Sequence, residues 1–256
     1  MRFAKYEGLG NDFIVVQAAV DAAQARALCD RHRGVGADGV LIVDPSERSM
    51  RVINADGSVP EMCGNGLRCV VWHLERTGAA SGELVMQTDA GPHRCWIHGP
   101  GDIEVEMRGA VFEPASVPVQ AAAPMIDAPF LDDVRLTAVS MGNPHAVTFD
   151  AVSEATEFAK RVQGDARFPE GVNVGFGASI DGGFSLRVYE RGVGWTEACG
   201  TGACAAAAAA VATDRASKDT PIAIELPGGR LTIVVQDGAV RMRGPARHVF
   251  DGETSL

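Results

Sequence analysis

Short apolar runs separated by turn-forming residues cover most of this chain. Runs of about four to eight residues, bounded by Gly, Pro, Asn or Asp, are typical of β-strands. They predict strands at residues 3–7, 13–18, 40–43, 50–54, 83–88, 93–98, 102–107, 136–141, 146–149, 184–190, 221–226, 229–236 and 239–244. Longer helix-forming segments predict helices at 22–31, 66–76, 152–162 and 203–212. The pattern therefore predicts many short strands and a few helices.

The motif Glu-X-Cys-Gly-X-Gly occurs twice, once in each half of the chain. The first copy spans residues 61–66 and the second spans 197–202, and a helix-forming run follows each copy. A Cys in a Gly-rich turn that opens a helix lies where backbone N–H groups without helical partners converge. Such a position binds anions and favours the thiolate form of the side chain. The repeated motif therefore predicts two reactive thiols, Cys63 and Cys199.

The spacing between matched residues indicates an internal duplication. Asn11 lies 52 residues before Cys63, and Asn143 lies 56 residues before Cys199. Both asparagines follow a Gly. Similar spacing between two local matches is typical of a repeated unit.

Composition predicts where the two repeats meet. Residues 114–129 contain four prolines and show no clear periodicity, so we predict a linker there. The expected domains are an N-terminal half at 1–117, which carries Cys63, and a C-terminal half at 118–256, which carries Cys199. The last strand could pack back on the first half.

Composition and charge narrow the class of protein. Hydrophobic residues make up 46% of the chain and charged residues 22%, which is typical of a globular protein in water. The 33 acidic and 23 basic side chains give a formal net charge of −10. This charge argues against a nucleic-acid partner and against an anionic membrane surface. A small anionic substrate stays compatible, because local N–H groups can dominate the field inside a pocket.

The cellular compartment can also be predicted. No signal peptide is visible, because Arg2, Lys5 and Glu7 interrupt any N-terminal apolar run. The longest apolar stretch, residues 203–212, is too short to span a bilayer. Six cysteines in a chain of this length do not form the disulfide framework of a small secreted domain. We therefore expect a cytoplasmic protein with reduced thiols.

Two thiols that face one substrate carbon suit an inversion of configuration. A thiolate removes a proton from one face and a thiol delivers a proton to the other, after which the two sulfur atoms have exchanged roles. A helix N-terminus can lower the pKa of a Cys from about 8.5, which places one sulfur in its basic form near neutral pH. The other cysteines fit small buried side chains: Cys29, Cys69, Cys95 and Cys204.

No cofactor or metal is expected. The α-proton of an amino acid is a weak acid, and many racemases use pyridoxal phosphate as an electron sink. None of the lysines, Lys5, Lys160 and Lys218, lies in a setting typical of a pyridoxal phosphate site, and the histidines are too scattered for metal ligation. The backbone N–H groups after Gly64 and Gly200 can instead stabilise the charge that develops on a substrate carboxylate.

Polar residues near the motifs are candidates for tuning the thiols and binding a substrate. His145 and Glu190 precede the second motif, and either could accept a proton from a neighbouring thiol. Arg191 suits a distant carboxylate through a bidentate contact. Asparagines at predicted turns would supply neutral donors and acceptors: Asn11, Asn54, Asn65, Asn143 and Asn173.

Together these stretches resemble the diaminopimelate epimerases. The matching segments are residues 10–13 (GNDF), 54–58 (NADGS), 62–69 (MCGNGLRC), 141–145 (MGNPH), 171–174 (GVNV), 189–192 (YERG) and 197–202 (EACGTG). They run from the N-terminus to about residue 204. Asn65 separates the chain from the similar proline racemases, which tend to carry a His at that position.

The resemblance implies an α+β fold of two pseudo-symmetric halves. Each half would be a curled mixed β-sheet or barrel around a central helix, with the active site in the cleft between the halves. Cys63 and Cys199 would be the catalytic acid and base, with His145 and Glu190 as their partners. The implied substrate-binding set is Asn11, Asn54, Gly64, Asn65, Asn143, Asn173, Glu190, Arg191, Gly200 and Thr201, of which Gly64, Asn65, Gly200 and Thr201 supply backbone donors.

The resemblance is also compatible with a homodimer. Some relatives carry a Gln in the loop at 34–39, where this chain has Gly39, so one substrate contact is expected to differ.

The resulting hypothesis is the cofactor-independent interconversion of LL- and meso-2,6-diaminopimelate, a step towards lysine and peptidoglycan precursors. One alternative is a racemase of another amino acid, such as histidine, on the same scaffold. A second is an isomerase-like relative without thiol chemistry, against which the presence of both cysteines argues. A third is a non-catalytic amino-acid binder or thiol sensor. Arg191 and the asparagines favour a substrate with a distal polar group.

Overall fold

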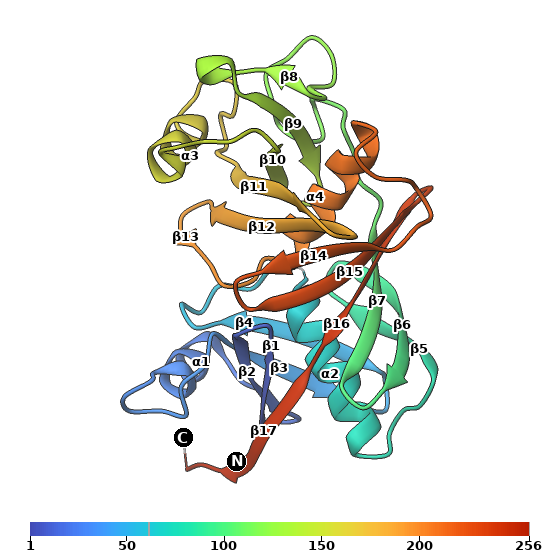
Figure 1. Cartoon of the computed structure of the whole chain (residues 1–256). Helices are drawn as coiled ribbons and strands as arrows, with labels where there is room; N and C mark the ends of the chain where they lie inside the picture. Colours follow the sequence, from blue (N-terminus) through green and yellow to red (C-terminus); the bar gives the residue numbers. More distant parts are fainter. Residues whose placement is uncertain (61, 256) are drawn as a thin grey trace. The chain divides into compact units, whose positions relative to one another are not determined.

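The structure is a computed structural model that describes residues 1–60 and 62–255. Glu61, the first residue of the first repeated motif, lies outside the described residues. The chain divides into two compact units (Figure 1). Unit 1 comprises residues 1–106 and 243–256, and unit 2 comprises residues 107–242.

In its described residues, unit 1 is built from short strands and two helices. The strands are β1 (Arg2–Gly8), β2 (Asn11–Val16), β3 (Gly39–Asp44), β4 (Ser49–Asn54), β5 (Glu83–Thr88), β6 (Gly91–Gly99), β7 (Asp102–Arg108) and β17 (Arg247–Glu253). The helices are α1 (Ala22–Cys29) and α2 (Gly64–Arg76).

The strands of unit 1 form a mixed sheet around α2. β1 pairs antiparallel with both β2 and β17. β2 and β3 are parallel, β3 and β4 antiparallel, β4 and β5 parallel, and β5 and β6 antiparallel. α2 contacts β1, β2, β3, β4, β6 and β17, and almost every residue from Gly64 to Leu74 is buried. A helix buried on all sides is expected where strands surround it.

Unit 2 has the same kinds of element. Its strands are β8 (Ala128–Pro129), β9 (Arg135–Ser140), β10 (Pro144–Thr148), β11 (Asn173–Ile180), β12 (Gly183–Glu190), β13 (Gly194–Trp195), β14 (Ile222–Leu226), β15 (Gly229–Gln236) and β16 (Ala239–Pro245), the last three residues of which belong to unit 1. Its helices are α3 (Ala155–Gln163), α4 (Gly200–Ala212) and the short 3₁₀ helix η1 (Leu131–Asp133). The described part of the chain thus combines four α-helices with a large mixed sheet.

The strand pairings of unit 2 repeat those of unit 1. β9 and β10 are antiparallel, β10 and β11 parallel, β11 and β12 antiparallel, β12 and β14 parallel, and β14 and β15 antiparallel. α4 contacts β9, β10, β11, β12, β14 and β15. Its buried residues include every alanine from Ala205 to Ala210. Such small side chains let the surrounding strands approach the helix closely.

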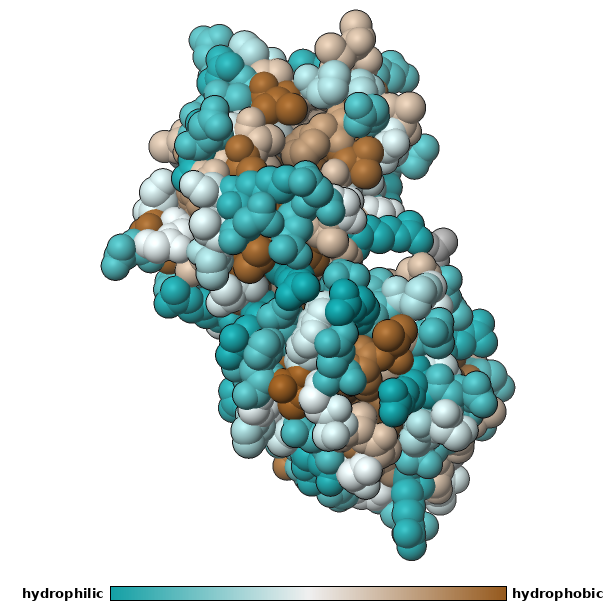
Figure 2. Space-filling view, turned by 90° about the vertical axis from the view of Figure 1, so that its right-hand side faces the viewer, coloured by the Kyte–Doolittle hydropathy of each residue, from teal (hydrophilic) through white to brown (hydrophobic). Residues whose placement is uncertain are grey.

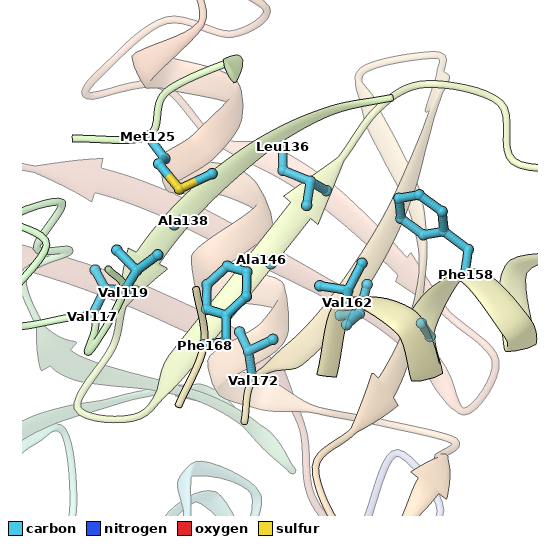
Figure 3. Packing of buried hydrophobic residues seen from close by; sticks show 12 residues of the cluster. Val117, Val119, Met125, Leu136, Ala138, Ala146, Phe158, Val162, Phe168 and Val172 are labelled. Atoms are coloured by element: carbon cyan, nitrogen blue, oxygen red, sulfur yellow. The ribbon is translucent and has the colours of Figure 1, made fainter. Parts of the chain in front are cut away.

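Each unit has an apolar core in which a helix covers the sheet. In unit 1, Ala25 and Leu28 of α1 lie in one buried cluster with Ile14, Val40 and Ile53. A capping box at Asp21 starts this helix. In unit 2, side chains of α3 pack against β9, β10 and β11, as Figure 3 shows for Phe158, Val162, Leu136 and Ala146.

The predicted linker at 114–129 is wrong in one respect. The segment has little regular structure, as its prolines indicate, but Val117, Val119 and Met125 are buried in the core of unit 2 (Figure 3). β8, at the end of the segment, also pairs with β9. The segment is therefore part of unit 2.

Several predicted bounds shift by a few residues. The helices that follow the cysteine motifs begin at Gly64 and Gly200 rather than at 66 and 203, because the glycines form the first helical turn. α1 ends at Cys29, before the predicted end at 31, and α3 covers 155–163 instead of 152–162. The strands β8, β11, β13 and β17 were not predicted.

Polar side chains cover most of the face in Figure 2, with small apolar patches between them. Among the described helices, none is long and apolar enough to cross a membrane.

Candidate active site

Three strand ends bring candidate residues to one edge of the sheet in unit 1. β2 begins at Asn11, and its parallel neighbour β3 begins at Gly39. Gly39 pairs with Asn54, the last residue of the antiparallel strand β4. A Cβ on Gly39 would lie 3.0 Å from the carbonyl oxygen of Ile53. The backbone is therefore tightly packed at the position where the sequence departs from the expected Gln.

Cys63 is the N-cap residue of α2. Its backbone is extended, at φ −137° and ψ 110°, and its side chain is half-buried. Its Sγ accepts a hydrogen bond from the backbone N–H of Gly66 at 3.4 Å. A Cβ on Gly66 would lie 2.9 Å from Cδ2 of Leu41, so the second Gly of the motif lets the turn approach β3. The N–H group and the helix dipole both favour negative charge on this sulfur.

The asparagine side chains of unit 1 are held by hydrogen bonds. Asn65 is 4% exposed and donates from Nδ2 to Oδ1 of Asn11 at 3.4 Å. Asn11 donates in turn to Oδ2 of Asp38 at 2.7 Å. Asn54 donates to Oγ of Ser58 at 3.0 Å. Because the Asn65 amide is buried among protein partners, its backbone N–H is the better candidate for a substrate contact.

Unit 2 has an equivalent sheet edge. β10 begins at Pro144, and the next residue, His145, pairs with Asn173 at the start of the parallel strand β11. The antiparallel strand β12 ends at Glu190 on the same edge, because the neighbouring pair joins Tyr189 to Val174. The predicted residues His145, Asn173 and Glu190 are therefore brought together by strand register.

Cys199 is the N-cap residue of α4 and is more buried than Cys63. Its backbone has φ −118° and ψ 103°, and the residue is 6% exposed. Burial raises the pKa of its thiol well above the usual range, and the negative charge of Glu190 raises it further. The Thr201 hydroxyl, 3.6 Å from Sγ, and the nearby Gly202 N–H lower this pKa in turn.

Glu190 and Thr201 give the Cys199 sulfur an acceptor and a donor. The half-buried Glu190 carboxylate lies near enough to the thiol to raise its pKa, and its Oε1 accepts from Oγ1 of Thr196 at 2.6 Å. A Cβ on Gly202 would lie 3.2 Å from Sγ and 2.9 Å from Cγ2 of Val188. Glycine at this position therefore leaves room for the sulfur.

His145 is a neutral, buried side chain. It is 1% exposed, and burial, together with the positive charge of Arg191, lowers its pKa to about 3. Its Nε2 lies 3.1 Å from Oδ1 of Asn143. Because that oxygen can only accept, Nε2 carries the proton in this arrangement. Asn143 then donates from Nδ2 to Oγ1 of Thr201 at 3.3 Å.

Asn173 and Arg191 hold two loops of unit 2 together. Asn173 is 5% exposed, donates from Nδ2 to the carbonyl oxygen of Pro144 at 3.0 Å and accepts from the backbone N–H of Arg191 at 2.9 Å. Its amide therefore contacts the backbone within the protein. The side chain of Arg191 is exposed, and its Nη1 donates to the carbonyl oxygen of Glu170 at 2.6 Å.

The remaining cysteines and lysines lie apart from this chemistry. Cys29, Cys69, Cys95 and Cys204 are buried, as predicted. Each lysine is paired with a carboxylate: Lys5 with Asp12, Lys160 with Glu157 and Lys218 with Asp237. Within the described residues, no group of His, Cys, Asp and Glu could hold a metal ion.

Sequence reasoning missed three polar residues beside the candidate set: Asp38, Arg68 and Thr196. Arg68 lies inside the segment 62–69 and Asp38 lies in the loop 34–39, so both were in view as sequence. Neither had a pattern that identified its partner.

Comparison with solved structures defines the class of fold. A probable proline racemase from Agrobacterium radiobacter superposes with a TM-score of 0.69 at 16% identity, over 100% of this chain and 93% of that chain. A phenazine biosynthesis protein of the PhzF family from Bacillus anthracis gives a TM-score of 0.72 at 13% identity, over 100% and 99%. At these identities the likeness concerns the fold alone, which is that of the epimerase and PhzF-like proteins.

Sequence comparison identifies the family within that class. The diaminopimelate epimerase model matches residues 3–113 and 137–249. The diaminopimelate epimerase of Desulforudis audaxviator is 43% identical over 99% of both chains, and that of Azotobacter vinelandii is 40% identical over 100% of this chain and 99% of its own. The chain belongs to the diaminopimelate epimerase family, a family of isomerases that work without pyridoxal phosphate.

Proposed function

We propose that this protein interconverts LL- and meso-2,6-diaminopimelate by a cofactor-independent, two-base mechanism. Family membership and full-length relatives near 40% identity support the reaction. The observation that carries the mechanism is the repeated position of the thiols. Cys63 and Cys199 each cap a helix that follows the same succession of strands, one in each unit.

The chemistry follows from two thiols of opposite protonation state. The thiolate of one Cys takes the α-proton, and the electron pair of the broken C–H bond spreads onto the adjacent carboxylate. The thiol of the other Cys then donates its proton to the opposite face of the carbon. Helix N-termini at Gly64, Asn65, Gly200 and Thr201 would supply N–H donors to the carboxylate, where charge develops in the transition state.

The candidate residues take distinct roles in this proposal. Glu190 accepts the Cys199 proton when that sulfur prepares to act as base, and Thr201 donates to the resulting thiolate. His145, neutral at working pH, orients Asn143 rather than carrying charge. Asn11, Asn54 and Arg191 would bind the distal part of the substrate, because Asn11 and Asn54 are polar and half-buried and Arg191 is exposed.

We propose further that the two units are pseudo-symmetric halves of a duplicated chain. The matched strand pairings and the buried helices α2 and α4 support a curled sheet around a central helix in each half. The domain bounds 1–117 and 118–256, an active site made by both halves, a cytoplasmic location and a homodimer stay predictions.

Substitution of each thiol tests the proposal. Cys63→Ala and Cys199→Ala are each expected to abolish epimerisation of both stereoisomers, because inversion needs a base and an acid on opposite faces. Activity is measured by separation of LL- and meso-diaminopimelate after incubation. Cys95→Ala is a matched control, since Cys95 is buried in β6. Full activity in either test variant, or turnover of histidine in place of diaminopimelate, would contradict the proposal.

A further inference from the structure

We propose that Asp38 and Arg68 are positioning residues that fix which way the side-chain amide of Asn11 is turned. The inference rests on the proposed function, in which Asn11 contacts the substrate. Neither Asp38 nor Arg68 belongs to the candidate set from the sequence.

Four side chains of unit 1 form one hydrogen-bonded chain. Nη2 of Arg68 donates to Oδ1 of Asn65 at 3.0 Å. Nδ2 of Asn65 donates to Oδ1 of Asn11 at 3.4 Å. Nδ2 of Asn11 donates to Oδ2 of Asp38 at 2.7 Å. The chain thus runs from a guanidinium to a carboxylate through two amides.

The chemistry of Arg68 and Asp38, at the two ends, fixes the direction of this hydrogen-bonded chain. A guanidinium can only donate hydrogen bonds and a carboxylate can only accept them. The oxygen and nitrogen of a side-chain amide are similar in size, so the amide can turn either atom towards a neighbour. Asn65 must turn its oxygen to Arg68 and therefore its nitrogen to Asn11. Asn11 must turn its nitrogen to Asp38 and therefore its oxygen to Asn65. Each amide is held from both sides.

Both ends are themselves anchored. Arg68 is fully buried at 0% exposure and also donates to the carbonyl oxygens of Pro245, at 3.3 Å, and Gly64, at 3.5 Å. Asp38 accepts from the backbone N–H of Asp12 at 3.1 Å and pairs with Arg31 at 2.7 Å. A buried guanidinium cannot exchange its partners for water at low cost, so the chain is kept in this direction.

The orientation matters because Asn11 is the member of the amide pair that is only half-buried. An amino-acid substrate presents an ammonium and a carboxylate, which need an acceptor and a donor respectively. If the amide of Asn11 turned over, its donor and acceptor would exchange places relative to these groups. The fixed orientation is therefore expected to lower KM and to leave proton transfer at the sulfur atoms, and thus kcat, nearly unchanged.

Reversing the direction of the hydrogen-bonded chain separates an effect on the orientation of Asn11 from an effect on the stability of the protein. Asn65→Asp alone puts Asn11 between two carboxylates, so we expect a lower Tm and a KM raised about tenfold. Combining Asn65→Asp with Asp38→Asn gives the side-chain donors of the hydrogen-bonded chain an acceptor again, but with Asn11 turned over. The Asp12 N–H, which donates to Oδ2 of Asp38, loses its acceptor in this variant. We expect this double variant to regain part of the lost Tm while its KM stays raised about tenfold. A structural role alone predicts that KM recovers together with Tm, and that result would overturn the proposal.

The orientation can also be read without any substrate. The chain has five asparagines, so selective ¹⁵N-asparagine labelling gives a simple side-chain amide spectrum. In the unmodified protein the Asn11 amide protons should show a nuclear Overhauser effect to the Asp12 N–H, since both donate to Oδ2 of Asp38. The double variant should lose this effect. If the Overhauser effect persists in the double variant, the hydrogen-bonded chain does not set the orientation of the Asn11 amide. This conclusion holds whatever reaction the protein catalyses.

Arg31→Gln is the matched control for the ion pair that the double variant loses. The Arg31 side chain is 55% exposed, and its removal leaves the Asp38 carboxylate free to accept from Asn11. Exposed ion pairs contribute little to stability, so we expect KM within about twofold of the unmodified protein and the same Overhauser effect. A tenfold rise of KM in this control would overturn the proposal, because it would assign the effect to the ion pair.

Discussion

Thr201→Val is expected to raise the pKa of the Cys199 thiol and to slow epimerisation near neutral pH. Oγ1 of Thr201 lies 3.6 Å from Sγ of Cys199 and accepts a 3.3 Å hydrogen bond from Asn143. Because Asn143 already donates to this oxygen, the hydroxyl hydrogen is available to the sulfur. Valine has nearly the same shape as threonine but lacks the hydroxyl, so it removes the donor without opening a large cavity.

The geometry sets the size of the effect. A hydrogen bond to a charged group contributes about 1.5 to 3 kcal/mol, and a separation of 3.6 Å places this bond at the lower end. Since about 1.4 kcal/mol corresponds to one pKa unit, we expect the pKa of Cys199 to rise by about one unit. At a pH below that pKa, the thiolate fraction and the rate fall about tenfold. Thr201→Ser keeps the hydroxyl and should stay within about 0.3 unit of the unmodified protein.

The pKa is measured from the pH dependence of Cys199 alkylation by iodoacetamide, followed by mass spectrometry in a Cys63→Ala background. The pH profile of kcat/KM for the intact pair of thiols gives an independent value. An unchanged pKa in Thr201→Val would remove Thr201 from the mechanism. A lowered pKa would mean that the Cys199 S–H donates to Thr201, which reverses the direction argued from Asn143.

Three further predictions concern unit 2. Gly202→Ala brings a Cβ to 2.9 Å from Cγ2 of Val188, so urea denaturation should show that the free energy of unfolding falls by about 1–3 kcal/mol. As a control, Gly99→Ala has no heavy atom within 4 Å of its added Cβ and should change the free energy of unfolding by less than about 0.5 kcal/mol. Burial lowers the pKa of His145 to about 3, so between pH 3 and about pH 6.5 the unfolded chain binds more protons than the folded protein. The free energy of unfolding should therefore fall by about 2 kcal/mol from pH 7 to pH 5. His145→Gln should flatten this pH dependence in urea titrations. Arg191→Gln should raise KM for diaminopimelate about tenfold and leave the alkylation pKa of Cys199 unchanged, because a charged contact to the substrate is lost while the thiol keeps its neighbours.

Local signals predicted the elements that depend on local sequence. The strand β3 was found because a continuous apolar run ends at Asp44, and β4 because a mostly apolar run ends at Asn54. The Gly-rich motifs located the starts of α2 and α4 to within three residues. β17 was missed because most of its residues are exposed, so it lacks an apolar pattern. It forms a strand because the edge of β1 is available to it, which is a tertiary fact.

Packing and partners could not be read from composition. Prolines at 114–129 correctly indicated irregular backbone, but irregular backbone can still bury Val117 and Met125. The candidate asparagines illustrate the same limit. Asn65 and Asn173 were predicted as substrate donors at turns, yet these residues are 4% and 5% exposed and their amides bond to neighbouring protein groups. Only the fold decides whether a turn residue faces solvent or interior.

The two thiols share a position on a helix but differ in what favours their charged form. Cys63 is half-buried and has the Gly66 N–H at 3.4 Å, whereas Cys199 is buried beside the Glu190 carboxylate and has the Thr201 hydroxyl. In an inversion each sulfur is the base in one direction and the acid in the other, so their proton affinities must be close during the reaction. Loss of the Thr201 donor unbalances the pair. Because a substitution cannot change the equilibrium between the two stereoisomers, kcat/KM must fall by the same factor in both directions, and an unequal fall would mean that the two assays do not follow one reaction.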